Sequence, residues 1–310
     1  GYAAAFLAAD LGKKVTMIDP EENPGGVCLY RGCIPTKALL HAVKTRRDAL
    51  EGKEWGITFD EPKLDLDALR TWKGKVVDRL TGGTATLAKR RKIERIRGMA
   101  TFSDPRTLEV SGEDGEQTLT AQSVIIATGG KPRSLPMLPE DERVWTSREA
   151  LDLPYIPERM LVIGAGYIGL ELSYTYAGLG ASVDIAEMTP DLMPGADRDL
   201  VSVFEKVNSD YYADILLSTT VDRVDAQKKG LKVSFDGEGA PEEPRTYDVI
   251  LSCVGRVPVT ETLNVEAAGL EVAEKGFIRV DNQRRTSQEH IFAVGDVAGS
   301  PLLAHKGQYE

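Results

Sequence analysis

The pattern GxGxxG at residues 164–169 constrains the fold of this chain more than any other feature of its sequence. An apolar run over residues 160–163 predicts a strand before the pattern, and a helix is predicted after it over residues 167–179. A second strand is predicted over residues 183–187. A strand, a glycine turn, a helix and a strand in this order are typical of α/β folds that bind dinucleotides.

Each glycine of this pattern has a physical role in holding a pyrophosphate. Gly164 permits a tight turn, Gly166 lets the backbone approach the phosphates, and Gly169 lets the helix pack closely on the strand. The phosphates would lie at the helix N-terminus, where unpaired backbone N–H groups favour negative charge. Glu187 ends the next strand eighteen residues after Gly169, at a position where a carboxylate can accept hydrogen bonds from a ribose diol. A glycine turn without any ligand is the weaker alternative, because it does not explain this acid.

The same helix–turn–strand unit occurs at the start of the chain, at a constant offset. The matching positions are Gly1 and Gly169, Ala9 and Ala177, Leu11 and Leu179, Gly12 and Gly180, Val15 and Val183, and Asp19 and Glu187. Two copies predict two nucleotide-binding domains. Gly1 then corresponds to the third glycine of a first motif, so we expect the chain to be a fragment that lacks the preceding strand.

Three apolar segments each lead into a glycine, as strands do at the edge where such sheets bind ligands. Residues 123–130 end in TGG, residues 247–256 end in VGR, and residues 289–296 end in VGD. Asp296 can be read as a structural turn residue, but its position at the carboxyl end of a strand favours a ligand hydroxyl. Cys253 lies on the second of these strands and is interpreted as a core residue. The order predicts one nucleotide domain that is interrupted by a second and then resumes.

The connection between the two repeats is predicted to contain helices and a small sheet. Residues 64–97 are interpreted as helices, with the basic run KRRKIERIR at residues 89–97 as a solvated helix face. Short alternating segments at residues 100–102, 107–110 and 118–120 predict an antiparallel sheet.

Composition limits the partners and the compartment. The net charge of −10 disfavours nucleic acid and anionic membrane surfaces. No apolar run approaches the length of about 20 residues that a membrane span needs. The three cysteines argue against a secreted disulfide scaffold and favour a reducing, cytoplasmic compartment. The sequence has no targeting segment, which carries little weight in a fragment.

The segment GGVCLYRGCIPTKALLHA holds two of the three cysteines, Cys28 and Cys33. Pro35 suits a first helical turn, so the nearby N–H groups and the helix dipole are expected to favour a thiolate at Cys33, and Lys37 adds a cation. A bridge between the two cysteines would need an irregular turn, which Gly32 permits. Zinc would need further cysteine or histidine ligands, so no metal site is predicted. A redox pair and two buried, inert cysteines both stay open on spacing alone.

Two dinucleotide motifs, a CxxxxC dithiol and a closing GD strand together resemble the flavin-dependent pyridine nucleotide–disulfide oxidoreductases. The resemblance spans essentially the whole chain. Within that family, the redox segment is more similar to that of the dihydrolipoamide-oxidising members than to those of glutathione or mercuric reductases. The resemblance implies an FAD domain at residues 1–145 and 273–310, an NAD domain inserted at residues 146–272, and a C-terminal dimerisation domain that is absent from this chain.

The resemblance also implies roles for individual residues. Cys28 would be the outer thiol that meets the substrate, and Cys33 would be the inner thiol stacked against the flavin. Lys37 would lie beside the flavin ring, paired with Glu171. Asp19 would hold the adenosine ribose of FAD, where the family usually has Glu. The other residues implied to line FAD are Gly1, Gly25, Gly26, Ala100, Thr128, Gly129, Gly130, Asp296, Leu302, Leu303, Ala304 and His305. Those implied to contact NAD are Gly164, Gly166, Gly169, Glu171, Glu187, Val221 and Gly255.

The cofactor preference is expected to follow from Glu187. Its carboxylate would bind a free 2′-hydroxyl and repel a 2′-phosphate, and no Arg or Lys follows it before Arg198. NAD is therefore favoured over NADP.

The activity implied is an electron relay. A dihydrolipoamide dithiol would reduce a Cys28–Cys33 disulfide, and the electrons would pass through FAD to NAD⁺. The implied partners are a lipoyl-bearing protein of a 2-oxo acid dehydrogenase or glycine cleavage complex, and a second copy of the chain in a homodimer. A related disulfide or mercuric reductase that uses FAD and NAD(P)H is one alternative. A non-catalytic, redox-sensing nucleotide-binding module is another.

Some positions depart from the family pattern. Val27 replaces the usual Thr before the first cysteine, and Val259 replaces the usual Asn, and we expect both to tune binding rather than abolish it. The family's acid–base His–Glu pair belongs to the C-terminal domain. His41, His290 and His305 do not fit that motif.

Overall fold

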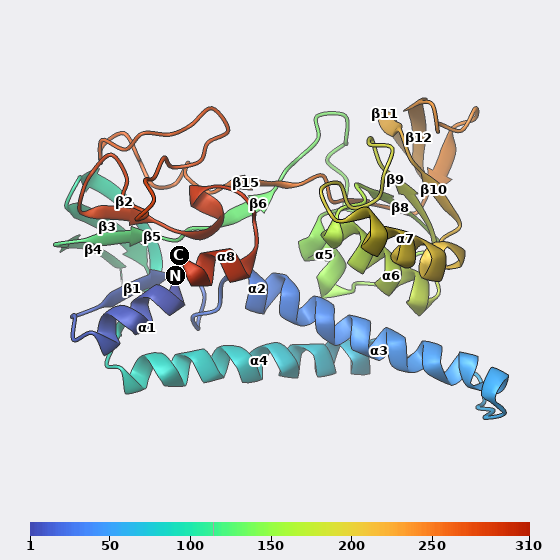
Figure 1. Cartoon of the computed structure of the whole chain (residues 1–310), viewed down its shortest axis with the longest axis horizontal. Helices are drawn as coiled ribbons and strands as arrows, with labels where there is room; N and C mark the ends of the chain where they lie inside the picture. The colour runs from blue at the N-terminus through green and yellow to red at the C-terminus, as the bar shows by residue number, and fades with distance from the viewer. Residues whose placement is uncertain (114) are drawn as a thin grey trace. The chain divides into compact units, whose positions relative to one another are not determined.

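The backbone passes between two compact units after residues 30, 76, 131 and 255 in the computed structural model, which describes residues 1–113 and 115–310. Unit 1 comprises Gly1–Tyr30, Val77–Lys131 and Arg256–Glu310, and unit 2 comprises Arg31–Val76 and Pro132–Gly255. Both contain helices and strands, which confirms the α/β class (Figure 1). The domain boundaries predicted at residues 145 and 272 are a different division of the chain and stay predictions.

Unit 2 is built on a five-stranded parallel sheet in the order β10-β9-β8-β14-β7. Its strands are β7 (Val144–Trp145), β8 (Arg159–Ile163), β9 (Ser182–Ala186), β10 (Asp214–Leu216) and β14 (Val249–Ser252). A second, antiparallel sheet contains β11 (Thr219–Gln227), β12 (Gly230–Gly237) and β13 (Arg245–Tyr247). The helices are α3 (Cys33–Glu51), α5 (Ser147–Asp152), α6 (Tyr167–Leu179) and α7 (Arg198–Asn208), with 3₁₀ turns η1 (Gly52–Trp55) and η2 (Ser209–Tyr211).

Strand β8 shows why the parallel sheet is apolar on both faces. Met160 and Val162 pack into the core cluster that contains residues of α6. Leu161 and Ile163 point to the opposite face and pack with residues of the antiparallel sheet. Because side chains alternate along a strand, a continuous apolar run is what a doubly covered strand requires. Figure 1 shows α5 and α6 on one side of β8 and β9, and β11 and β12 on the other.

Helix α3 crosses α6 at a glycine. A Cβ atom added at Gly178 would lie 2.1 Å from Cγ1 of Val43, whose side chain is buried. Glycine is therefore needed in the last turn of α6, where alanine is otherwise favoured.

Gly178→Ala is expected to lower the free energy of unfolding by about 1–3 kcal/mol, because the added methyl group overpacks this crossing. The cost should shrink when Val43 is also replaced with alanine, and urea unfolding of both single variants and the double variant measures this coupling. A Gly178→Ala protein that is more stable than the parent would contradict the crossing described here.

The described part of unit 1 contains a four-stranded sheet and two pairs of strands. One sheet has the order β1-β2-β3-β4, with β1 parallel to β2 and the other pairs antiparallel. These strands are β1 (Thr16–Asp19), β2 (Glu94–Asp104), β3 (Thr107–Gly112) and β4 (Gly115–Thr120). Strands β5 (Val124–Ile126) and β16 (Ile291–Ala293) pair in parallel, and β6 (Gly130–Pro132) pairs with β15 (Arg256–Pro258). Its helices are α1 (Tyr2–Asp10), α8 (Ala304–Tyr309) and the 3₁₀ turn η3 (Gly295–Ala298).

Two helices run across the unit boundaries, α2 (Gly26–Arg31) and α4 (Leu66–Arg90). No helix in the described part of the chain is both long enough and apolar enough to cross a membrane. The antiparallel sheet predicted from residues 100–120 is confirmed by β2, β3 and β4.

The helical interpretation of residues 89–97 is wrong. Helix α4 ends at Arg90, and Lys92 has a positive φ of 55°. The N–H of Ile93 then donates to the carbonyl of Ala88 at 3.1 Å, a hydrogen bond that is typical of a helix C-terminus. From Glu94 the chain is strand β2, which pairs with β1. Pairing with a distant strand overrode the local helical composition.

Candidate functional site

A disulfide joins Cys28 and Cys33. Helix α2, which carries Cys28, ends at Arg31, and α3 begins at Cys33. Gly32 lies between them with φ −148° and ψ −117°, so the helical path is broken at this residue. This is the irregular turn that a bridge between these cysteines needs. The alternative of two unlinked, inert cysteines is therefore wrong.

Cys33 occupies the first turn of α3, a helix of 19 residues. The first helical hydrogen bond runs from the N–H of Thr36 to the carbonyl of Gly32 at 3.1 Å. Pro35 lies in the same turn, as predicted, and lacks an N–H group of its own. A helix N-terminus favours negative charge, so this position stabilises a thiolate on Cys33 once the disulfide is reduced.

Lys37, one turn further along α3, forms an ion pair with Glu171 of α6. The two side chains are 60% and 29% exposed, so the pair adds little to stability. The pair instead links the first turns of α3 to the glycine motif of unit 2, because Glu171 lies two residues after Gly169. The predicted pairing of Lys37 with Glu171 is present.

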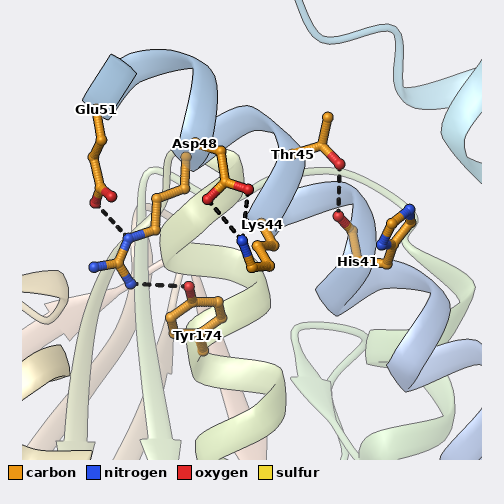
Figure 2. Close-up of polar contacts among 7 residues, drawn as sticks. His41, Lys44, Thr45, Asp48, Glu51 and Tyr174 are labelled. Atoms are coloured by element: carbon orange, nitrogen blue, oxygen red, sulfur yellow. Dashed lines mark hydrogen bonds and ion pairs between the residues drawn. The ribbon is translucent and has the colours of Figure 1, made fainter. Parts of the chain in front are cut away.

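Further contacts hold α3 against α6 in unit 2. Nη1 of Arg46 donates to the carbonyl of Gly178 at 3.0 Å. Arg47 donates from Nη1 to the Tyr174 hydroxyl at 3.1 Å and from Nε to Glu51 at 2.5 Å. Figure 2 shows Tyr174 directed toward α3, with Glu51 on the last turn of that helix. The helix that begins at Cys33 is thus fixed to the helix that carries the nucleotide motif.

The glycine turn of unit 2 has the geometry expected for a pyrophosphate. Gly164 has φ +98°, and a Cβ atom there would lie 2.6 Å from the carbonyl oxygen of Cys253. A Cβ atom at Gly169 would lie 2.0 Å from the carbonyl oxygen of Gly164. At Gly166, by contrast, no described atom would lie within 4 Å, and no described side chain caps α6 there. The turn therefore leaves space at the N-terminus of α6, where the helix dipole favours an anion.

Glu187 lies against this turn, immediately after β9. Its side chain accepts hydrogen bonds from the N–H of Ala165 at 2.7 Å and from the N–H and hydroxyl of Thr189 at 2.9 and 2.8 Å. The residue is only 6% exposed. These donors fix the carboxylate at the position expected for a ribose-binding acid. Thr189 was not predicted, although a hydroxyl residue two positions after an acid is a recognisable local signal.

Glu187→Arg is expected to weaken NADH binding by at least about tenfold and to shift the preference toward NADPH, because charge-assisted hydrogen bonds are lost. Fluorescence titration with NADH and NADPH measures both affinities. Glu187→Asp is the matched control, since Asp19 occupies the equivalent position of the first repeat, and it should keep the preference for NADH. An unchanged NADH to NADPH ratio in Glu187→Arg would show that specificity is set elsewhere.

Asp19 ends β1 in unit 1, at the position that corresponds to Glu187. Its Oδ1 accepts a hydrogen bond from the N–H of Glu21 at 2.9 Å. Burial raises the pKa of the Asp19 carboxyl group, partly offset by that hydrogen bond. Gly1 precedes α1, and a Cβ atom there would lie 3.1 Å from Cβ of Ala127 at the end of β5. The first repeat thus has its helix close to the strand end, as the second repeat does.

The strand ends of unit 1 meet around Asp296. A Cβ atom at Gly130 would lie 3.4 Å from Oδ2 of Asp296. Arg256 donates to the carbonyl of Gly130, and its Nε lies 3.5 Å from the same carboxylate oxygen. Arg256 was not predicted as a site residue, because its partners are remote in sequence. A carboxylate held in this way at the strand ends suits hydroxyl groups of a nucleotide cofactor.

Two hydrogen bonds connect the loop after β5 to Val259. The Thr128 hydroxyl donates to the carbonyl of Val259 at 2.6 Å, and the N–H of Val259 donates to the carbonyl of Gly129 at 3.0 Å. Because Val259 contributes its backbone, its departure from the family's usual Asn leaves this loop intact.

The remaining predicted residues lie at segment ends, in the cores of the two units, or in the turn at Gly255. Gly25 and Gly26 precede and begin α2, and Leu302 to His305 lead into and begin α8, all at segment ends in unit 1. Ala100 packs against the core of unit 1 and Val221 is buried in the core of unit 2, so both have only backbone to offer a ligand. Gly255 has φ +102°, and its carbonyl accepts from the N–H of Arg133 at 3.0 Å.

Comparison with known proteins agrees with this geometry. The profile of the pyridine nucleotide-disulphide oxidoreductase family matches residues 1–310. The chain belongs to this family. Membership implies FAD and NAD(H) as cofactors, which fits the glycine turn of unit 2 and the strand-end acids Glu187 and Asp19.

Several members of the pyridine nucleotide-disulphide oxidoreductase family are similar over the whole chain. A dihydrolipoyl dehydrogenase of Vibrio cholerae is 47% identical over 311 residues, covering 100% of this chain and 65% of the relative. A dihydrolipoyl dehydrogenase of Thermus scotoductus is 43% identical, with 100% and 66% covered. The solved structure of the HOCl-induced flavoprotein disulfide reductase RclA from Escherichia coli, a Cu(II) complex, superposes with a TM-score of 0.84 at 27% identity, covering 100% of this chain and 66% of that chain. The chain thus spans about 65% of the length of the first of these relatives.

Proposed function

We propose that the protein containing this chain is an FAD-containing dihydrolipoamide dehydrogenase that uses NAD⁺. The observation that carries the proposal is the Cys28–Cys33 disulfide at the start of α3, a helix tied to the nucleotide motif of α6 through Lys37 and Glu171. The identity of 47% to a dihydrolipoyl dehydrogenase supports this substrate over others. The reductase RclA, at 27% identity, supports an alternative disulfide substrate less strongly.

In this proposal the two cysteines exchange disulfides with the substrate. One substrate thiolate attacks Cys28, forms a mixed disulfide and releases Cys33 as a thiolate. The second substrate thiolate then displaces Cys28, so the product leaves as a cyclic disulfide and both cysteines are reduced. The N-terminus of α3 holds the negative charge on Cys33. When bound, FAD supplies the two-electron acceptor between this thiolate and the nicotinamide.

Other residues hold the cofactors in place. The carboxylate of Glu187, fixed by Thr189 and Ala165, accepts the ribose hydroxyls of NAD. Asp19 and Asp296 accept hydroxyl groups of FAD. The Lys37–Glu171 pair orients the cation beside the flavin. The acid–base group for the substrate dithiol belongs to the family's C-terminal domain, and no residue of this chain takes that role in the proposal.

The proposed partners follow from the substrate. They are a lipoyl-bearing protein of a 2-oxo acid dehydrogenase or glycine cleavage complex, and a second copy of the full-length protein in a homodimer. A cytoplasmic compartment is proposed because three cysteines with one exchangeable disulfide suit a reducing environment.

Steady-state turnover of the full-length protein tests the proposal. Dihydrolipoamide with NAD⁺ should be oxidised rapidly, and NADP⁺ should be a poor acceptor. Glutathione disulfide and mercuric ion, each with NADH or NADPH, serve as the competing substrates. Rapid turnover of either competitor without dihydrolipoamide oxidation would replace the proposed substrate, and bound FAD without any turnover would favour the redox-sensing alternative.

A further inference from the structure

The side chains of Lys306, in α8, and Glu310, directly after α8, hold the turn that carries Asp296. Nζ of Lys306 donates to the carbonyls of Gly295 and Gly299, at 3.0 and 2.8 Å. Oε2 of Glu310 accepts from the N–H of Gly295 at 2.7 Å. Both polar backbone groups of Gly295 are therefore bound by α8 and the residue that follows it, and the 3₁₀ turn η3 is held at its two ends.

The helix and the turn also touch through their backbones. Gly295 has φ +75°, and a Cβ atom added at Gly307 would lie 3.1 Å from Cα of Gly295. Two facing glycines thus bring α8 close enough for the side chains on either side of Gly307 to reach the turn.

The charges of this contact are largely removed from water. The side chains of Lys306 and Glu310 are 14% and 1% exposed. They form an ion pair of 3.1 Å, and Nη2 of Arg284 lies 3.2 Å from the same carboxylate oxygen. Because a buried pair of this kind also bonds to backbone, loss of either partner leaves unpaired polar groups in the fold.

The contact joins two segments that the proposed function places at the flavin. Asp296 lies within η3, and Ala304 and His305 form the first turn of α8. We propose that Lys306 and Glu310 are positioning residues of the FAD site, a proposal that rests on the proposed flavoenzyme function. They fix the carboxylate of Asp296 relative to the start of α8 through their contacts with Gly295 and Gly299.

FAD affinity of the full-length protein tests this inference. Lys306→Met removes the donors and keeps the length of the side chain, and Glu310→Gln removes the charge and keeps the shape. Each should raise the dissociation constant of FAD at least about tenfold, because hydrogen bonds to charged groups are lost. Lys306→Arg should restore most of the affinity, and Tyr309→Ala, which alters an exposed position of the same helix, should bind FAD like the parent.

Two readouts separate positioning from a purely structural role. The first is reconstitution of the apoprotein with FAD, followed by flavin fluorescence and by the shape of the visible absorption bands. The second is thermal unfolding of the same apoproteins. Glu310→Gln provides the test if Lys306→Met does not fold.

Folded variants that bind FAD as tightly as the parent, with the same visible spectrum, would overturn the inference whatever their melting temperatures. Failure of the proposed function looks different, because the parent protein would then bind FAD but not oxidise dihydrolipoamide, while the effect of both variants on FAD binding would persist.

Discussion

Cys28→Ser and Cys33→Ser are each expected to lower the turnover of dihydrolipoamide with NAD⁺ by at least about a thousandfold, as removal of a covalent nucleophile does in other enzymes. Either substitution removes the disulfide at the start of α3. Without it the substrate dithiol has no bond to reduce, so no electrons reach the flavin. Steady-state rates of the full-length variants measure the loss.

Absorption spectra distinguish the two cysteines. Cys33→Ser should abolish the long-wavelength absorbance of a thiolate-to-flavin complex in the two-electron-reduced protein while FAD stays bound. Cys28→Ser should keep that band, since the inner thiolate is intact. Persistence of the band in Cys33→Ser would refute the assignment of Cys33 as the inner thiol.

Cys253→Ser is the matched control for both variants. Cys253 is a free thiol that follows β14, and burial raises its pKa to about 12. It is therefore protonated at neutral pH and is not a nucleophile. Turnover and spectrum should be those of the parent, and a large loss of activity would mean that a third cysteine takes part in the relay.

Asp184→Ala is expected to lower the free energy of unfolding by about 1–3 kcal/mol, the cost of leaving a buried hydrogen-bond donor without its partner. The Asp184 side chain is 4% exposed on β9. Its Oδ2 accepts from Arg245 at 2.9 Å and from the Tyr247 hydroxyl at 2.7 Å, and burial raises the pKa of that phenol. Truncation leaves the buried Tyr247 hydroxyl without this acceptor and leaves the Arg245 guanidinium group with Asp214 alone.

Asp214→Ala provides the comparison, because Asp214 binds the other end of the same guanidinium group at 2.8 Å but is 39% exposed. Water replaces an exposed carboxylate readily, so a loss of only about 0–1 kcal/mol is expected. Urea unfolding of the two variants measures both values. Equal losses would show that burial does not decide the strength of this network.

The nucleotide motifs could be predicted from the sequence because their physics is local. The close contact that requires Gly169 lies within the motif, at the carbonyl of Gly164, and helix α6 has the predicted bounds of residues 167–179. Gly164 itself has a positive φ and faces the distant carbonyl of Cys253, a contact that only the fold reveals. The Lys37–Glu171 pair is 134 residues apart, and no local pattern predicts it. It could be predicted only through the resemblance to a family.

Contacts that depend on the fold alone were missed or misread. The run at residues 89–97 has helical composition, but pairing of β2 with β1 made its second half a strand. Arg256 reaches Gly130 and Asp296 only because β15 and β6 are neighbours. Lys306 and Glu310 show the i,i+4 spacing of an ion pair in a helix, yet that spacing does not reveal that Gly295 lies between their side chains.

The hydrogen bond from Ala165 to Glu187 has a consequence for how such proteins diverge. In the proposed function this carboxylate selects the ribose, and in the structure it also anchors the glycine turn. A lineage that exchanges this acid for a base to accept NADP would lose the anchor in the same mutational step. We therefore expect the substitutions around Ala165 and Thr189 that restore the turn to be acquired first, while the older cofactor is still in use.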